Sequence, residues 1–165
     1  MLDSRGVELN VGNDLNELAN NSKAWVYTSS QEFSEVQLDQ IAKYSEVFLS
    51  QWESHGNLIK GTVQVLKNRF IAIFADANND MCGRAQDASV KFVKELQEIL
   101  NVSLMDRMLI AFNQDNKIKV LNFNNLRNEI SSGNISENTL FYNGLIQSKE
   151  EFMTNWEIPI KGSWI

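Results

Sequence analysis

The pattern of apolar and polar residues is most regular between residues 34 and 53. Apolar side chains recur there every three or four positions, on one face of a helix: Leu38, Ile41, Tyr44, Phe48 and Trp52. Ser34 and Gln37 have the spacing of a capping box at the start of this helix. At its end, His55 and Gly56 suit the last turn and the left-handed residue that closes a helix. We therefore expect one continuous helix that stops at His55-Gly56.

Short runs of β-forming residues predict strands on both sides of this helix. AWVYTSS, from residue 24, precedes it, and GTVQVL and RFIAIFA follow it on either side of a Lys67-Asn68 turn. Residues 70–75 are apolar at every position, whereas a half-exposed strand alternates. This strand is therefore expected to be central in a sheet and covered on both faces.

A second amphipathic helix is expected after the loop that contains Cys82. Asp87 is a plausible N-cap for it, and Asn101 can close its end. Two further strands, RMLIAF and KIKVLNF, flank a polar NQDN turn. A short helix in NNLRNEISSG and a short strand in TLFYNGLI follow. The remaining tail has only a weak signal for secondary structure.

The order of these elements predicts the fold class. From residue 24 to 112 it is strand, helix, strand, strand, helix, strand. This order predicts an α+β fold, a ferredoxin-like βαββαβ sandwich with an antiparallel sheet and two helices on one face. Residues 1–23 are rich in Asn, Asp, Glu and Ser and are expected to be a polar N-terminal arm, loosely held or with a short helical turn. Residues 113–165 are expected to be a C-terminal extension that covers the open face of the sheet or extends its edge.

Composition and charge narrow the function classes. The chain has 165 residues and a formal net charge of −6, which disfavours binding to duplex nucleic acid because that needs a cationic surface. No signal peptide and no run of 18 apolar residues is recognisable, so we expect a cytoplasmic protein without membrane insertion. One cysteine and one histidine exclude internal disulfides and a Cys-based zinc cluster. No metal and no cofactor is expected.

One candidate for chemistry is a ligand pocket built from loops at one end of the predicted sheet. Its residues would be His55, Gly56, Asp76, Arg84, Asp87 and Ser89. An imidazole, a carboxylate and a helix N-terminus can together hold an anionic or hydroxylated ligand. A nucleotide phosphate loop is excluded, because Thr62 stands where the motif that begins at Gly56 would require lysine.

Cys82 is a second candidate. Its expected place near the positive end of the second helix would lower the pKa of its thiol, and Arg84 would act in the same direction. A nucleophilic thiol also needs a positioned base. The sequence leaves open whether His55 lies at the same edge of the fold as Cys82 or at the opposite one.

The C-terminal tail carries Trp156 and Trp164 in a segment without regular periodicity. Aromatic side chains in such a segment either pin it to the core or form a patch that recognises a partner. Pinning is favoured, because a loose tail with exposed tryptophan and isoleucine would promote aggregation. The recognition patch stays open as the alternative.

Several motifs resemble those of a small uncharacterised bacterial family whose members are often labelled "ABC transporter ATPase". They are WVYTSS, QWESHG, NRFIAIFAD, DASVKF, Asp106-Arg107 and TLFYNGLIQSKEEFMTNWEIPIKGSW. The resemblance runs from about Asp14 to the C-terminus. It implies a family and no ATPase activity, because the chain has neither G-x-x-x-x-G-K-[ST] nor an LSGGQ-like signature. Arg84, Lys91 and Ile165 stand where family members often carry a cysteine and two histidines.

Residues 108–146 also resemble the GYF-type peptide-binding unit. The resemblance rests on a strand pair, a leucine-containing helix, Gly-x-Ile, and a Thr-Leu-aromatic strand before a Gly-hydrophobic end. It implies that Phe141, Tyr142 and Trp156 help to bind a peptide.

The sequence therefore leads to two functional hypotheses. The preferred one is a non-catalytic protein-interaction or self-association module, which binds a protein partner or a second copy through Phe141, Tyr142, Trp156 and Trp164. The alternative is an enzyme or small-ligand binder with a pocket near His55, Asp76 and Asp87.

Overall fold

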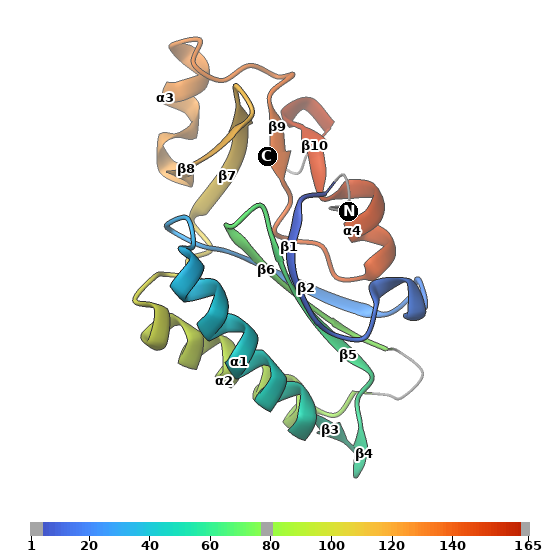
Figure 1. Cartoon of the computed structure of the whole chain (residues 1–165). Helices are drawn as coiled ribbons and strands as arrows, with labels where there is room; N and C mark the ends of the chain where they lie inside the picture. The colour runs from blue at the N-terminus through green and yellow to red at the C-terminus, as the bar shows by residue number, and fades with distance from the viewer. Residues whose placement is uncertain (1–4, 77–80, 163–165) are drawn as a thin grey trace.

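A computed structural model describes residues 5–76 and 81–162. In these ranges the chain forms two four-stranded antiparallel sheets, one short hairpin and four α-helices (Figure 1). The protein is therefore of mixed α+β class, as the sequence predicts. No helix in the described ranges is long and apolar enough to cross a membrane.

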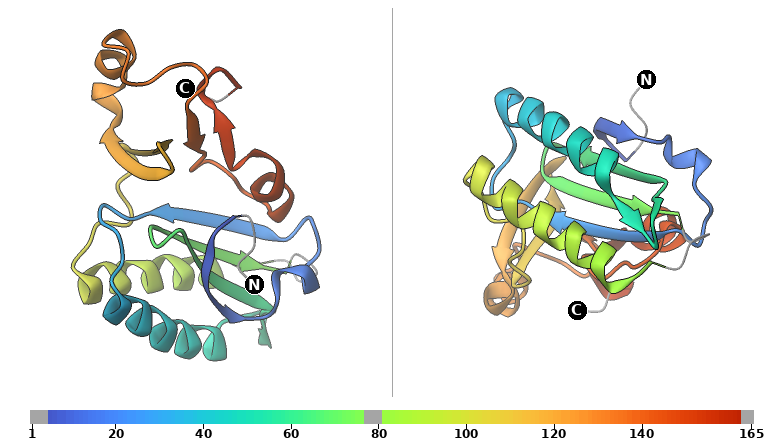
Figure 2. Two further views of the ribbon diagram at one scale, coloured as in Figure 1. Left: turned by 45° about the horizontal axis from the view of Figure 1, so that its top comes forward. Right: turned by 90° about the horizontal axis from the view of Figure 1, so that it is seen from below.

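The first sheet has the strand order β1-β5-β6-β2, with antiparallel pairing throughout. Its strands are β1 (Val7–Gly12), β2 (Lys23–Thr28), β5 (Gly61–Leu66) and β6 (Phe70–Ala75). The two long helices, α1 (Glu35–Gln51) and α2 (Gly83–Leu100), lie side by side across one face (Figure 2). The expectation that residues 24–28 and 70–75 share one sheet below two helices is confirmed.

Three of the four strands of the expected ferredoxin-like sheet lie together in the first sheet, but the fourth does not. The strand expected to complete the sheet, β7 (Leu109–Gln114), lies in the second sheet instead. The edge beside β2, where that strand would pair, meets residues 147 and 148. There the Ala24 N–H donates to the Gln147 carbonyl at 3.1 Å, and Lys23 forms an antiparallel bridge with Ser148.

The N-terminal arm contains a short helical turn, which was one of its two expected forms, and it also contains a strand. Residues 7–12 form the edge strand β1 beside β5, and Leu15–Glu17 form a single 3₁₀ turn. Every second residue of β1 is partly buried, and Leu9 packs against the core beneath the helices. Leu15 and Leu18 are buried. This segment is held because its apolar residues alternate and reach the core of the first sheet.

The start of α1 and the end of α2 form as the sequence predicts. Ser34 and Gln37 make both hydrogen bonds of the capping box. Asn101 closes α2 with a φ of 53°. The start of α2 differs: it begins at Gly83 with Cys82 at the N-cap, so Asp87 lies inside the helix and does not cap it.

The end of α1 differs more. The helix stops at Gln51, and β3 (Glu53–Ser54) pairs with β4 (Asn57–Leu58) in a small hairpin. His55 and Gly56 form its two-residue turn, with φ of 52° and 80°. Two positive φ values are what such a tight hairpin turn requires. The expectation that His55-Gly56 closes the helix is therefore wrong.

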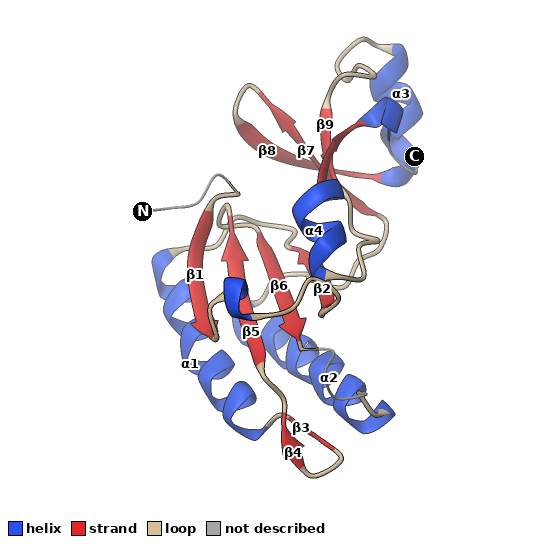
Figure 3. Cartoon of the chain, turned by 90° about the vertical axis from the view of Figure 1, so that its right-hand side faces the viewer, coloured by secondary structure: helices blue, strands red, loops and turns tan. Residues whose placement is uncertain are grey.

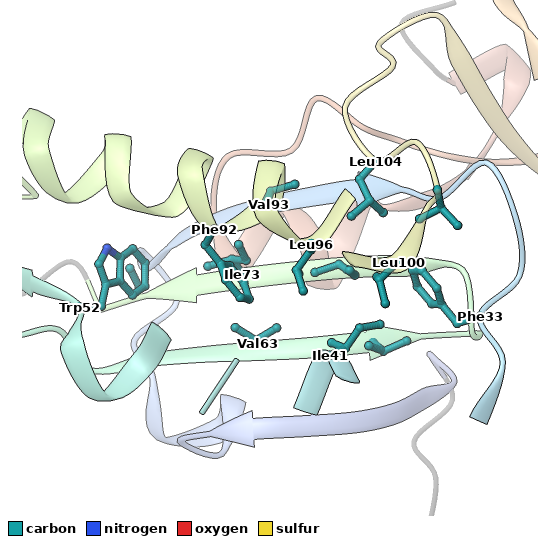
Figure 4. Packing of buried hydrophobic residues seen from close by; sticks show 14 of the residues in the cluster. Phe33, Ile41, Trp52, Val63, Ile73, Phe92, Val93, Leu96, Leu100 and Leu104 are labelled. Carbon is teal, nitrogen blue, oxygen red and sulfur yellow. The ribbon is translucent and has the colours of Figure 1, made fainter. Parts of the chain in front are cut away.

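Residues from α1, α2 and the facing side of the sheet form the main core. Figure 4 shows Val93 and Leu96 of α2 above Val63 and Ile73 of the sheet, with Ile41 contributed by α1. All five are fully buried. Each such side chain contributes about 1.5–3 kcal/mol to the free energy of unfolding.

The strand β6 is buried at all six positions because two cores meet on it. Ile71 and Ile73 face the helices, whereas Phe70 and Phe74 face the C-terminal part of the chain. Of the two arrangements that the sequence left open for the C-terminal extension, the structure shows residues of this extension packed on the open face of the sheet.

The second sheet has the strand order β10-β9-β7-β8 (Figure 3). Its other strands are β8 (Lys117–Asn122), β9 (Leu140–Tyr142) and β10 (Glu157–Pro159). The short helix α3 (Leu126–Ser131) packs on it through Leu126, beside Ile110, Phe112 and Phe141. This small core packs β7 within the second sheet, while Ala111 of β7 also reaches the core on the open face of the first sheet. A fourth helix, α4 (Lys149–Asn155), forms in the tail, where the pattern of residues is only a weak signal for secondary structure.

Candidate functional site

The β3–β4 hairpin brings the His55 turn against the N-terminus of α2. Ser54 on β3 is almost fully buried, and its hydroxyl accepts a 3.0 Å hydrogen bond from the Cys82 N–H. His55 and Cys82 therefore lie at the same end of the helix pair, which the sequence left open. A second bond fixes this corner, because the Trp52 indole N–H donates to the Ala85 carbonyl at 2.8 Å.

Several hydrogen bonds lower the pKa of the Cys82 thiol from 9.0 to about 7. The largest contribution comes from the Ser54 hydroxyl, and the next from the Ala85 N–H. The His55 and Arg84 N–H groups add smaller contributions, while partial desolvation acts in the opposite direction. Donors that point at a sulfur stabilise the thiolate. Arg84 thus acts through its backbone, whereas the sequence predicted an effect of its charge.

Two residues of the expected pocket meet at Cys82, because the backbone N–H groups of His55 and Arg84 both point at its sulfur. His55, Arg84 and Asp87 are exposed, and Asp76 is half-buried after β6. Ser89 is buried, and its hydroxyl donates to the Gln86 carbonyl of its own helix at 2.7 Å. An added Cβ at Gly56 would meet open space. None of the six expected residues lines either cavity described below.

The aromatic residues expected to bind a partner are buried instead. Phe141, Tyr142 and Trp156 are 2%, 5% and 2% exposed. Trp156 packs edge-on against Phe70 of β6 at a centroid distance of 5.1 Å and against Tyr142 at 4.9 Å. Three buried side chains do not form a partner surface, so the expectation of a recognition patch at these residues is corrected. They attach the C-terminal segment to the core instead. Trp164 lies outside the described residues.

Two polar atoms of this aromatic cluster stand out. The Trp156 indole nitrogen is buried and has no hydrogen-bond partner among the described residues. The Tyr142 hydroxyl is also buried, and it lies near the side chains of Asn113 and Glu157, which both act on its pKa. Burial raises the pKa of Tyr142, and the negative charge of Glu157 raises it further. Trp156 therefore acts through its apolar ring system.

A shallow depression lies at the C-terminal end of α2, where Gln97, Asn101 and Ser103 face Ser30. The side-chain amide oxygen of Gln97 already accepts from the Leu104 and Met105 N–H groups, at 2.8 and 2.9 Å. The Ser30 hydroxyl accepts from the Ser103 N–H at 3.0 Å. These polar groups hold the chain after α2, and fewer of them remain for a ligand.

A groove of about 230 Å³ runs between the solvent sides of α1 and α2, and we call it the α1–α2 groove. From α1 it is lined by Tyr44, Val47, Phe48 and Gln51. From α2 it is lined by Ala88, Lys91, Phe92, Glu95, Leu96 and Ile99.

The floor of the α1–α2 groove is apolar and its rim is partly exposed. Phe48 and Phe92 stack at a centroid distance of 4.3 Å with nearly parallel rings. Val47 is 51% exposed and Tyr44 is 39% exposed. Large apolar side chains exposed side by side are typical of a surface that contacts another protein.

The sequence pattern placed Tyr44 on the buried face of α1, and its exposure corrects that assignment. The groove itself was missed, although one signal for it exists. Val36 and Val47 are apolar and lie outside the stripe that faces the sheet, and both are exposed. A surface helix normally has one apolar face, which packs on the core, so apolar residues on a second face indicate a further contact.

No group of three or more His, Cys, Asp or Glu side chains in residues 5–76 and 81–162 has the geometry to hold a metal ion.

The chain matches no protein-family model, no curated protein and no solved structure. The family resemblance and the GYF-like resemblance therefore stay predictions. What the surface can bind follows from the geometry of the described residues alone.

Proposed function

We propose that this protein is a non-catalytic interaction module that binds a protein partner through the α1–α2 groove. The observation that supports this function is the exposed apolar rim of that groove, above all Val47, on helices whose other faces already pack on the sheet. The proposal keeps the function class that the sequence favoured. It moves the contact surface from the C-terminal aromatic residues to the helix pair.

The physical reason is the cost of leaving this rim in water. Covering apolar surface gains about 25 cal/mol for each Å². The stacked Phe48 and Phe92 rings give the groove a rigid floor, so little conformational freedom is lost when a partner side chain enters. Lys91 and Glu95 at the rim supply polar contacts that fix the orientation of the partner.

A photo-crosslinking experiment tests the proposal. The full chain carries p-benzoylphenylalanine in place of Val47, and a control carries it in place of Leu145, an apolar residue that is 61% exposed and lies outside the groove. We expect a discrete protein adduct from position 47 in cells that express the chain, and a weaker or different pattern from position 145. Equal patterns from the two positions would contradict the proposed surface.

A second candidate function is small-ligand chemistry at Cys82, and one observation favours it. The Cys82 sulfur lies among the Ser54 hydroxyl and three backbone N–H groups, which stabilise its thiolate at neutral pH. A base beside the sulfur, which a nucleophilic mechanism needs, is not part of this arrangement as far as the described residues show. Turnover of an electrophilic ligand, lost in Cys82→Ser, would favour this function over the first.

A further inference from the structure

We infer that the occupant of the α1–α2 groove is a second copy of this chain, bound about a two-fold axis that crosses both helices at Val47. The inference rests on the proposed function and names its partner. The supporting observation is that residues able to pair with each other lie on either side of one point of the groove, Lys91 and Glu95 on α2 and Tyr44 and Gln51 on α1.

The two helices run antiparallel, and two hydrogen bonds fix their relative position. The Trp52 indole joins the end of α1 to Ala85 near the start of α2, and the Gln37 amide joins the start of α1 to the Leu100 carbonyl at 2.9 Å. Between these bonds, Phe48 stacks on Phe92. The residues beside Phe48 on α1 and beside Phe92 on α2 are therefore at the same level of the groove.

On α2, Lys91 and Glu95 lie one turn apart and both line the groove. A two-fold axis between them places Lys91 of each copy opposite Glu95 of the other, which forms two ion pairs of opposite sign. The midpoint of this pair falls next to Phe92, at the level of Phe48. The same axis therefore passes α1 at Val47.

On α1, the same axis gives matching contacts. Val47, the most exposed apolar residue of the rim, meets Val47 of the second copy. Tyr44 and Gln51 lie at nearly equal distances along the helix on either side of this point, so the Tyr44 hydroxyl of one copy faces the Gln51 amide of the other. A surface in which residue i meets residue j and j meets i is what a two-fold interface requires.

The size of the surface limits the area that two copies can bury against each other. Helices of 17 and 18 residues are about 26 Å long and about 10 Å wide, so the pair presents roughly 500 Å². This is at the low end for specific interfaces. We expect a reversible dimer that forms in the micromolar range and is promoted by raising the protein concentration.

Sedimentation velocity of the full chain over a concentration series tests the inference. We expect monomer and dimer in exchange for the wild-type chain. Val47→Asp is expected to remain monomeric, because it places two carboxylates against each other on the axis. The exposure of Val47 means that this variant should fold, and its circular dichroism and thermal unfolding check that it does.

Charge exchange tests the axis itself. Lys91→Glu and Glu95→Lys should each raise the dissociation constant about tenfold, because each brings like charges together twice. The double exchange Lys91→Glu with Glu95→Lys should restore the wild-type value. The matched controls are Lys94→Glu, Glu98→Lys and their combination, which make the same changes on exposed residues of α2 outside the groove. These controls should leave the dissociation constant unchanged.

A wild-type chain that is monomeric throughout the series overturns the inference. So does a dimer that survives Val47→Asp, or one that Lys91→Glu and Lys94→Glu weaken equally. The proposed function is tested separately by the mass of the adduct at position 47. An adduct with a different protein beside a monomeric chain keeps the proposed function and refutes the second copy, whereas no adduct and no dimer refutes both.

Discussion

The indole N–H of Trp52 donates a 2.8 Å hydrogen bond to the carbonyl oxygen of Ala85, and both residues are buried. This bond joins the end of α1 to the first turn of α2. It fixes the end of α1 relative to the start of α2, next to the β3–β4 hairpin that contacts Cys82. The two candidate sites of the protein therefore depend on the same contact.

Replacement of Trp52 should show how much of this contact is packing and how much is the hydrogen bond. We expect Trp52→Ala to lower the free energy of unfolding by about 3–5 kcal/mol, because it leaves a cavity under both helices. Trp52→Phe keeps most of the ring and loses the bond, so we expect about 1–3 kcal/mol. Urea unfolding of the two variants measures both. Equal losses would mean that the ring contributes nothing beyond the bond.

Gly61 approaches this same indole closely. A Cβ at Gly61 would lie 3.0 Å from a ring carbon of Trp52 and 3.2 Å from the Phe74 carbonyl oxygen. We expect Gly61→Ala to lower the melting temperature, with a cost of about 1–3 kcal/mol. Gly83→Ala, where a Cβ meets nothing within 4 Å in the first turn of α2, is the control and should be neutral or stabilising. Two equal shifts would argue against crowding at Trp52.

Cys82 should react as a partly ionised thiol at neutral pH. Its pKa is lowered to about 7, so the rate of alkylation by iodoacetamide should rise through that pH and level off above it. Cys82 is the only cysteine of the chain, which makes the measurement specific. Ser54→Ala removes the largest contribution and should move the midpoint of the rate profile upwards. A midpoint that stays the same in Ser54→Ala would contradict the role of this hydroxyl.

Trp156 should behave as a core residue and not as a recognition residue. We expect Trp156→Ala to cost about 3–5 kcal/mol in the free energy of unfolding, because the ring fills the space between Phe70, Tyr142 and Phe152. Trp156→Phe should cost less, because it removes an indole N–H that has no partner among the described residues. Met153→Ala, on the exposed side of α4, is the control and should stay within about 0.5 kcal/mol. A small loss in the free energy of unfolding for Trp156→Ala would contradict its role in the core and would favour its role in partner recognition.

Tyr142 should make the protein sensitive to alkaline pH. Burial raises the pKa of Tyr142 in the folded chain, while an unfolded tyrosine ionises near its ordinary value of 10.0. Above that pH the unfolded chain loses a proton that the folded chain retains, so the free energy of unfolding falls as pH rises. Tyr142→Phe should reduce this fall and be nearly neutral at pH 7. Chemical denaturation at a series of alkaline pH values measures the free energy of unfolding of both chains. The same dependence on pH in the wild-type chain and in Tyr142→Phe would exclude this role for Tyr142.

Residues that are close together in the chain are enough to predict the local elements of the first sheet. The capping box of Ser34 and Gln37, the Lys67-Asn68 turn and the left-handed Asn101 all depend on residues close in the chain, and all are present. The apolar run of β6 also carried enough information to show that both of its faces are covered. The alternation of Val7, Leu9 and Val11 was a readable strand signal that the polar composition of the arm concealed.

Which of these elements contact one another depends on how the whole chain packs. The edge beside β2 is occupied by residues 147 and 148, far along the chain, and this contact directs β7 to another sheet. Burial of Trp156 and exposure of Val47 depend likewise on which surface packs against which. Local hydrogen bonds and turn geometry act over a few residues and are written in the sequence. Competition among distant segments for one edge or one apolar face is resolved only when the whole chain has packed.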